Sequence, residues 1–140
     1  MGKISNIYLY LKLRKKIKSS SVVKADYLRF SEIFEKNPIL SKLLLKKILN
    51  SSLDKRIKET LAKVFLDSIK ERRNFFKELK LIAIFTPDAF FYKYWIKNLM
   101  HSMPVEQYLE LCSIIIGNTE NKSLRKLTEN MQIFYEAHYG

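Results

Sequence analysis

The sequence has few of the residues that interrupt regular structure or carry reactive chemistry. Its 140 residues include three glycines, three prolines, one cysteine and two histidines. So few turn-forming residues favour long helices and argue against an all-β fold, which needs many tight turns. The glycine-rich phosphate-binding motifs GxGxxG and GxxxxGKS or GxxxxGKT are absent. This absence argues against a dinucleotide-binding domain and a P-loop NTPase.

The reactive side chains that are present do not form a recognisable catalytic or metal site. Cys112 is alone, so it cannot form an intrachain disulfide, and its apolar neighbours predict a buried thiol. His101 and His138 lie far apart, and neither has a metal-ligand spacing. The carboxylates mostly share helix faces with Lys or Arg. We therefore predict no catalytic residue, no metal ligand, no cofactor and no enzymatic activity.

Long hydrophobic runs are also missing. The longest uncharged stretches, such as residues 81–87 and 111–119, fall short of the roughly 18–20 residues that a membrane-spanning helix needs. The first basic cluster follows the first apolar run, whereas a secretory signal would place it before. We expect a soluble protein made in the cytoplasm, with enough apolar residues for a substantial core.

Charge is distributed unevenly along the chain. Residues 1–80 contain 21 basic and 8 acidic side chains, a net charge of +13, whereas residues 81–140 contain 5 and 6, a net charge of −1. The first 24 residues hold seven Lys or Arg and no Asp or Glu. This asymmetry indicates a polyanionic partner, either nucleic acid or an anionic membrane surface, held by the N-terminal part.

The candidate nucleic-acid-binding residues come from this N-terminal region. Tyr8 and Tyr10 lie among the cations and could hydrogen-bond phosphate or sugar, although either could equally be a packing residue. No zinc-finger, RNP or basic-zipper pattern accompanies the charges, which favours phosphate contacts without base reading. The predicted set is Lys3, Tyr8, Tyr10, Lys12, Arg14, Lys15, Lys16, Lys18, Lys24, Arg29, Lys42, Lys46 and Lys47.

Hydrophobic periodicity predicts helices over the whole first third. Residues 4–18 fit both a strand and a helix, and we favour a helix because Leu, Lys and Arg are good helix formers. Residues 23–36 have one apolar stripe, and Asn37 and Pro38 should end this helix and begin the next, over residues 39–49.

The remaining periodic segments predict four more helices. The apolar spacing indicates one long helix over residues 53–82, then helices over 88–103, 105–116, with Gly117 as its C-cap, and 124–138. The long helix also carries Arg56, Lys63, Lys70 and Lys77 at sevenfold spacing, which we interpret as a solvated face.

The predicted fold is therefore all-α, with two parts. Residues 51–140 should form an antiparallel four-helix bundle. Residues 1–50 should form an extended basic helical arm that wraps nucleic acid. The arm is too apolar to stay free in water, so it should pack on the polyanion, on another copy, or on both.

A group of aromatic residues predicts a subunit interface. Phe90, Phe91, Tyr94 and Trp95 place bulky rings on more than one side of their expected helix. Aromatic residues are enriched in buried interface cores, so we expect part of this group to pack on another subunit. The alternative is that all four lie inside one monomer.

Residues 94–109 (YWIKNLMHSMPVEQYL), continuing through SIIIGN at 113–118, resemble the C-terminal bundle of the coat proteins of rod-shaped and filamentous archaeal DNA viruses. An aromatic-rich helix there meets a proline-initiated helix that ends in an apolar run and glycine. The length and the basic arm are similar to the major coat proteins of lipothrixviruses. The chain departs from the related rudiviral pattern by its helix after Gly117 and by its Lys-rich arm.

The resemblance implies a virion protein. Two copies, or two paralogous coat proteins, would pair and wrap double-stranded DNA in its A form, assembling a helical filament that a lipid envelope could cover. Apolar residues among the cations would strip water from the duplex, and low hydration favours A-form DNA. Two other functions fit the residues: a membrane-surface protein that uses residues 4–18 as an amphipathic helix, and a helical DNA-binding or adaptor protein outside viruses.

Overall fold

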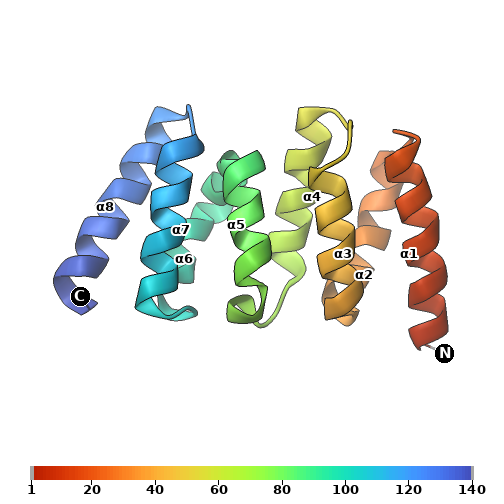
Figure 1. Cartoon of the computed structure of the whole chain (residues 1–140), viewed down its shortest axis with the longest axis horizontal. Coiled ribbons are helices and arrows are strands. Elements are labelled where there is room, and N and C mark those ends of the chain that lie inside the picture. Colours follow the sequence, from red (N-terminus) through yellow and green to blue (C-terminus); the bar gives the residue numbers. More distant parts are fainter. Residues whose placement is uncertain (1, 140) are drawn as a thin grey trace. The chain divides into compact units, whose positions relative to one another are not determined.

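The computed structural model describes the backbone of residues 2–139 and the side chains of residues 5–138. Every regular element in this part of the chain is helical, which confirms the predicted all-α class. The chain divides into two compact units, Met1–Lys70 and Glu71–Gly140 (Figure 1). The division therefore falls at Lys70 and not after residue 50, where the sequence predicted it.

The described residues of the first unit, 2–70, form four α-helices and one short 3₁₀ helix. These elements are α1 (Gly2–Lys18), η1 (Lys24–Asp26), α2 (Tyr27–Lys36), α3 (Pro38–Leu49) and α4 (Lys55–Ser68). The four α-helices alternate in direction, so α1 and α3 run the same way (Figure 1). Helix α1 packs on α2 and α3, and α4 packs on the same two helices.

The reversal between α2 and α3 follows the predicted sequence signal. Asn37 has an extended backbone, and its side-chain oxygen accepts a hydrogen bond from the Leu40 amide at 3.0 Å. Pro38 begins α3, where its missing N–H costs nothing. Aromatic rings form part of the core near this turn: Phe34 contacts Phe30 in a tilted arrangement and Phe65 edge to face, at centroid distances of 6.1 and 5.1 Å.

Helix α1 is docked in the first unit and is not an extended arm. It buries Tyr10, Leu13 and Ile17, which recur at spacings of three and four and so share one face. This face belongs to the core that α1 shares with α2 and α3. The apolar content that suggested packing on a partner is therefore partly satisfied within the same chain.

The long helix predicted over residues 53–82 is interrupted. Helix α4 ends at Ser68, Ile69 is extended and buried, and Glu71 is also non-helical. The Ser68 hydroxyl donates to the Val64 carbonyl at 2.6 Å, a local bond that competes with helix continuation. The expected apolar stripe also has no member between Ser68 and Phe75, so the pattern does not favour a continuous helix there.

The second unit combines three longer helices with short helical segments. Its elements are η2 (Arg72–Phe75), α5 (Phe76–Phe85), η3 (Pro87–Tyr94), α6 (Trp95–Asn98), η4 (Leu99–His101), α7 (Val105–Asn118) and α8 (Lys122–Tyr139). Helix α7 packs on both α5 and α8. Because α4 belongs to the first unit, the predicted four-helix arrangement over residues 51–140 is not what the structure shows.

The segment predicted as a helix over residues 88–103 is irregular. Lys93 and Tyr94 both have φ of 51°, in the left-handed region that bulky residues rarely adopt. Side chains from α7 and α8 hold the backbone after this kink. The Tyr108 hydroxyl donates to the Ile96 carbonyl at 2.8 Å, and the Tyr135 hydroxyl donates to the Met100 carbonyl at 2.7 Å. Tertiary contacts thus override the helical periodicity.

The end of α7 also differs from the prediction. Gly117 lies inside the helix, and the C-cap residue is Thr119. The Thr119 hydroxyl donates to a carboxylate oxygen of Asp88 at 2.6 Å, and its oxygen accepts from the Asn121 amide. This threonine therefore organises the turn between α7 and α8, so the positive φ that glycine supplies at a C-cap is not required.

Candidate nucleic-acid interface

A basic groove lies between α1 and α3 of the first unit. It has a volume of about 560 Å³ and is lined by Arg14, Ile17, Lys18, Leu43, Lys46, Lys47, Asn50 and Ser51. Four of these residues are cations that the sequence predicted as nucleic-acid-binding, and all four are exposed. None of the lining residues is acidic. The structure thus brings together two pairs of predicted residues that are about 30 positions apart in the chain.

Helix geometry explains how α1 contributes to the groove. With 100° between successive residues, Ile7, Leu11, Arg14 and Lys18 follow one stripe. This stripe lies beside the buried face that contains Leu13 and is exposed along its length. Its first half is apolar and its second half is basic, so the cations gather toward the C-terminal end of α1.

Helix α3 repeats this arrangement. Ile39, Leu43, Lys46 and Asn50 form a second stripe at the same spacing, and Lys47 lies next to it. Helices α1 and α3 run the same way (Figure 1), and the cations at the C-terminal ends of both stripes line the groove. Lys46 and Lys47 lie in the last turn of α3 and Lys18 in that of α1, where the helix dipole favours cations.

The groove also lies in the unit that holds nearly all the excess charge. Residues 1–70 contain 17 basic and 6 acidic side chains, a net charge of +11, whereas residues 71–140 contain 9 and 8, a net charge of +1. Several acids of the first unit lie next to a cation of the same unit, as Glu32 with Lys36 and Glu59 with Lys63. A polyanion would therefore find its most favourable surface on the first unit.

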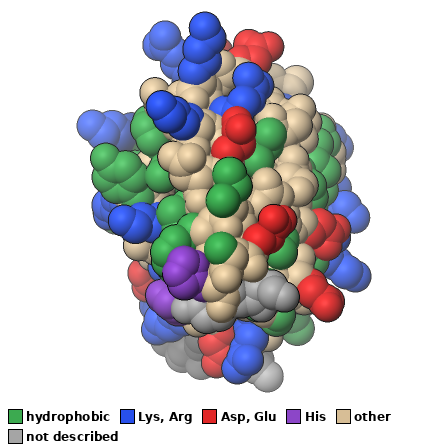
Figure 2. Space-filling view, turned by 90° about the vertical axis from the view of Figure 1, so that its left-hand side faces the viewer, with side chains coloured by type: hydrophobic (Ala, Val, Ile, Leu, Met, Phe, Trp, Pro, Cys, Tyr) green, Lys and Arg blue, Asp and Glu red, His purple; other side chains and the backbone are tan. Residues whose placement is uncertain are grey.

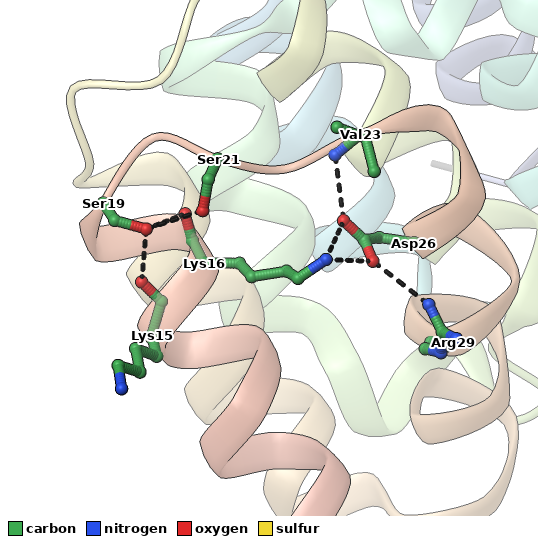
Figure 3. Close-up of polar contacts among 7 residues, drawn as sticks. All are labelled: Lys15, Lys16, Ser19, Ser21, Val23, Asp26 and Arg29. Carbon is green, nitrogen blue, oxygen red and sulfur yellow. Dashed lines mark hydrogen bonds and ion pairs between the residues drawn. The ribbon is translucent and has the colours of Figure 1, made fainter.

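Asp26 forms ion pairs with two of the predicted cations, Lys16 and Arg29, so these two are less available to a partner. Its carboxylate lies 2.9 Å from the Lys16 ammonium and 3.3 Å from the Arg29 guanidinium, and it also accepts from the Val23 amide at 2.9 Å (Figure 3). Asp26 itself is fully buried, whereas Lys16 and Arg29 are partly exposed. Asp26 is the first acidic residue in the chain. Its position directly after the basic stretch could have indicated this cluster, but the sequence analysis did not consider it.

Serine side chains next to this cluster stabilise the turn after α1. The Ser19 hydroxyl donates to the Lys15 carbonyl at 3.0 Å and lies 2.6 Å from the Ser21 hydroxyl (Figure 3). Ser20 takes a φ of 53°, which lets the chain reverse toward Val23.

Burial alone would raise the pKa of Asp26, but the hydrogen bond from the Val23 amide and the positive charges of Lys16 and Arg29 outweigh the effect of burial. The pKa of this carboxyl therefore lies below its ordinary value of 3.8.

This pKa shift predicts how stability depends on pH. Asp26→Asn should lower the free energy of unfolding by about 2 kcal/mol at neutral pH, because it removes a buried charge that two cations stabilise. A carboxyl with a lowered pKa stabilises the fold above its unfolded-state pKa, and this contribution is lost as the pH falls through the folded-state pKa.

Urea unfolding of the wild type and the variant across pH measures this difference directly. The difference in unfolding free energy should be constant above a pH of about 5 and should shrink progressively below a pH of about 4. A difference that stays unchanged at pH values well below the pKa of Asp26 would show that its charge is not responsible.

The other predicted residues divide into groups by their surroundings. Tyr10 is only 8% exposed and is a core residue, whereas Tyr8 is 77% exposed. Lys12, Lys15 and Lys24 are exposed outside the groove lining. Lys42 is half-buried on α3, and the side chain of Lys3 lies outside the described residues.

The predicted interface aromatics also divide into two pairs. Phe90 and Trp95 are buried in the second unit, where their rings lie 6.2 Å apart and Arg72 stacks 4.4 Å from the Trp95 ring centroid. Phe91 and Tyr94 are 36% and 60% exposed, and their rings meet edge to face at 6.2 Å. Only Phe91 and Tyr94 can therefore meet another molecule without rearrangement.

The surface of the second unit differs from the groove in its charge pattern. Figure 2 shows the face of the molecule that includes α8: several basic side chains gather at its upper end, and hydrophobic, basic and acidic side chains are mixed over the rest. Exposed apolar residues of α8 include Ile133 and Phe134. With a net charge of +1, this unit attracts a polyanion less than the first unit does.

The reactive side chains of the described residues do not gather into a metal site. In this part of the chain, no group of three His, Cys, Asp or Glu side chains is placed to hold a metal ion. Cys112 is fully buried, as predicted, and burial raises the pKa of its thiol to about 12. No helix formed by the described residues has the length and apolar character needed to cross a membrane.

Comparison with known proteins gives no relative: no protein-family model, curated protein or solved structure matches the chain.

Proposed function

We propose that this chain is a structural protein that binds double-stranded DNA without sequence preference through the groove between α1 and α3. One observation supports this function above all: four exposed cations from two helices line one groove that contains no acidic residue. Each Lys or Arg that neutralises a phosphate releases condensed counterions, and this release drives non-specific binding.

The lack of sequence preference follows from the residues at the site. The groove offers ammonium and guanidinium groups on short stretches of two parallel helices, together with Asn50 and Ser51. Phosphate contacts position a protein on a duplex but carry no sequence information. No recognisable base-reading element accompanies them, so affinities for unrelated duplexes should differ only through the cost of deforming each sequence.

The finer part of the proposal is that many copies coat the DNA as a viral filament. Its support is the resemblance of residues 94–118 to archaeal viral coat proteins and the exposed aromatic pair Phe91 and Tyr94. Charge also restricts how copies can meet: two first units, each with a net charge of +11, repel each other without DNA, whereas second units at +1 do not. We therefore place the contact between copies on the second unit.

The aromatic pair predicts a measurable self-association. Replacing Phe91 and Tyr94 together with Ser should weaken association of the protein without DNA, because it removes the exposed rings that an interface core would bury. Sedimentation over a wide concentration range measures the change. Tyr8→Ser, which removes an exposed ring from the first unit, is the control and should leave sedimentation unchanged. Identical sedimentation of wild type and double variant would remove this interface from the proposal.

A second function is favoured by one specific observation. The apolar halves of the two stripes, Ile7 and Leu11 on α1 and Ile39 and Leu43 on α3, are exposed and continue into the basic groove. A surface that joins apolar and basic side chains also fits an anionic lipid bilayer.

The two functions are separated by binding assays with duplex DNA, anionic vesicles and neutral vesicles under the same buffer. If the protein binds DNA as proposed, its affinities for unrelated duplexes of equal length should agree within a few-fold. The number of copies bound at saturation should increase in proportion to DNA length. Binding to anionic vesicles alone would establish the membrane-surface function instead. One tight site on one sequence would point to a regulator.

A further inference from the structure

We infer that Asp26 is a positioning residue for polyanion binding: it holds α1 in the rotation that presents Arg14 and Lys18 to the groove. This inference rests on the proposed function of the groove. It assigns a role to a buried carboxylate that touches neither the groove nor any bound molecule. Its main consequence is that loss of a negative charge should weaken binding to a polyanion.

The geometry of α1 provides the first step. Lys16 follows Arg14 by two residues and precedes Lys18 by two, so it lies about 200° around the helix from each of them. The side chain of Lys16 reaches Asp26 at the start of α2 (Figure 3), whereas Arg14 and Lys18 line the groove with α3. Holding Lys16 on the α2 side therefore turns the other two cations toward α3.

The contacts of Asp26 provide the second step. Its two carboxylate oxygens receive the Lys16 ammonium at 2.9 and 3.1 Å, the Val23 amide at 2.9 Å and the Arg29 guanidinium at 3.3 Å. These donors come from α1, the connecting segment and α2. One buried group thus joins the end of α1 to the element that comes after it, across a turn in which Ser20 has a positive φ.

The burial pattern provides the third step. The buried face of α1, including Leu13 and Ile17, lies between Lys16 on one side and the stripe of Arg14 and Lys18 on the other. Apolar packing is non-directional and permits some rotation of the helix about its axis. Charge-assisted hydrogen bonds are directional, so the contact between Lys16 and Asp26 selects one rotation.

The test compares two variants that make the same change in net charge. Asp26→Asn and Glu35→Gln each remove one negative charge from the first unit, but Glu35 is exposed on α2. If binding depended on net charge alone, both variants would bind duplex DNA slightly more tightly than the wild type. Positioning by Asp26 predicts the opposite sign for Asp26→Asn: affinity about threefold weaker or more, with Glu35→Gln unchanged or slightly tighter.

Salt dependence gives a second, independent readout. Four phosphate contacts correspond to a slope of roughly −4 for log K against log salt, and loss of two contacts would bring it to about −2. Asp26→Asn should therefore show the shallower slope, whereas Glu35→Gln should keep that of the wild type. Equal affinity and equal slope for the two variants would overturn the inference.

A distance measurement keeps the inference testable even if the protein does not bind DNA. Spin labels placed at Lys15→Cys on α1 and Ile39→Cys on α3, both exposed positions, report how firmly α1 is held against α3. Asp26→Asn should broaden the distribution of distances, and Glu35→Gln should not. An unchanged distribution would overturn the inference, whereas failure of all proteins to bind DNA would reject only the proposed function.

A second pair of variants applies if Asp26→Asn does not fold. Lys16→Gln breaks the same contact from the other side and leaves Asp26 paired with Arg29. Lys55→Gln removes one exposed cation of α4 that neither lines the groove nor belongs to the predicted nucleic-acid-binding set, and it serves as the matched control. Lys16→Gln should give the shallower salt slope and the broader distance distribution, and Lys55→Gln should give neither. Equal results for the two variants would overturn the inference.

Discussion

Replacing Arg14, Lys18, Lys46 and Lys47 together with Gln should lower the affinity for duplex DNA about four-thousandfold at 0.1 M salt. The physical reason is counterion release: each phosphate contact contributes close to a factor of ten at this salt concentration, and the four cations share one groove. A fluorescence anisotropy titration with a labelled duplex measures the change. Circular dichroism should show an unchanged helical fold, because all four side chains are exposed.

The matched control removes the same charges from the second unit. Arg73, Lys97, Lys122 and Lys126 are also one arginine and three exposed lysines, and changing them to Gln lowers the net charge by the same amount. If the groove is the interface, this control should keep most of the wild-type affinity. Equal losses in the two variants would mean that overall charge, and not the groove, determines binding.

Leu13→Asp should destabilise the first unit by about 4 kcal/mol or more. Leu13 is fully buried in α1, and a carboxylate in its place would have no partner in an apolar core. The expected result depends on α1 being docked, since a helix that projects from the protein as a free arm would tolerate the change. Chemical denaturation, monitored by the loss of helical signal, measures the free energy of unfolding.

Leu11→Asp provides the comparison on the same helix. Leu11 is 51% exposed, so an aspartate there can remain hydrated and should change stability by less than about 1 kcal/mol. A small effect of both substitutions would show that α1 does not belong to the folded core. Deletion of residues 1–24 should likewise destabilise the first unit, because it removes the buried face of α1 with its cations.

The sequence allowed prediction of those helices whose apolar spacing and end signals agree. The asparagine and proline at positions 37 and 38 mark the boundary of α2 and α3 correctly, because one caps the new helix and the other can begin it. A helix over residues 4–18 was also predicted, but its buried face was not, because periodicity does not reveal which apolar residues of a helix pack against the rest of the chain. Residues 4–18 were therefore assigned to an arm, although their buried face completes a core in the same chain.

The errors in the prediction arise where tertiary contacts decide the local conformation. Periodicity alone continued a helix through Ser68, where a serine bond to the preceding turn and the buried Ile69 redirect the chain. The segment after Pro87 looked helical, yet hydrogen bonds from Tyr108 and Tyr135 hold it in short irregular turns. The two tyrosine contacts join residues that are 12 and 35 positions apart in the chain, so they leave no periodic signal.

The candidate site was also predictable only in part. The list of cations was available from composition, but their grouping was not, because the groove depends on α1 and α3 lying side by side and running the same way. Lys16 and Arg29 looked equivalent to their neighbours until the structure placed Asp26 between them. A buried carboxylate thus separates cations that are available to a partner from cations that stabilise the fold.

The salt dependence of duplex binding tests the central claim most directly. The groove should neutralise four phosphates, so log K should fall with log salt with a slope of roughly −4, and the slope should be the same for unrelated duplex sequences. Measuring the affinity at four or more salt concentrations for two sequences of equal length is sufficient. A slope near −1, or a slope and affinity that depend strongly on sequence, would contradict phosphate binding by the groove between α1 and α3.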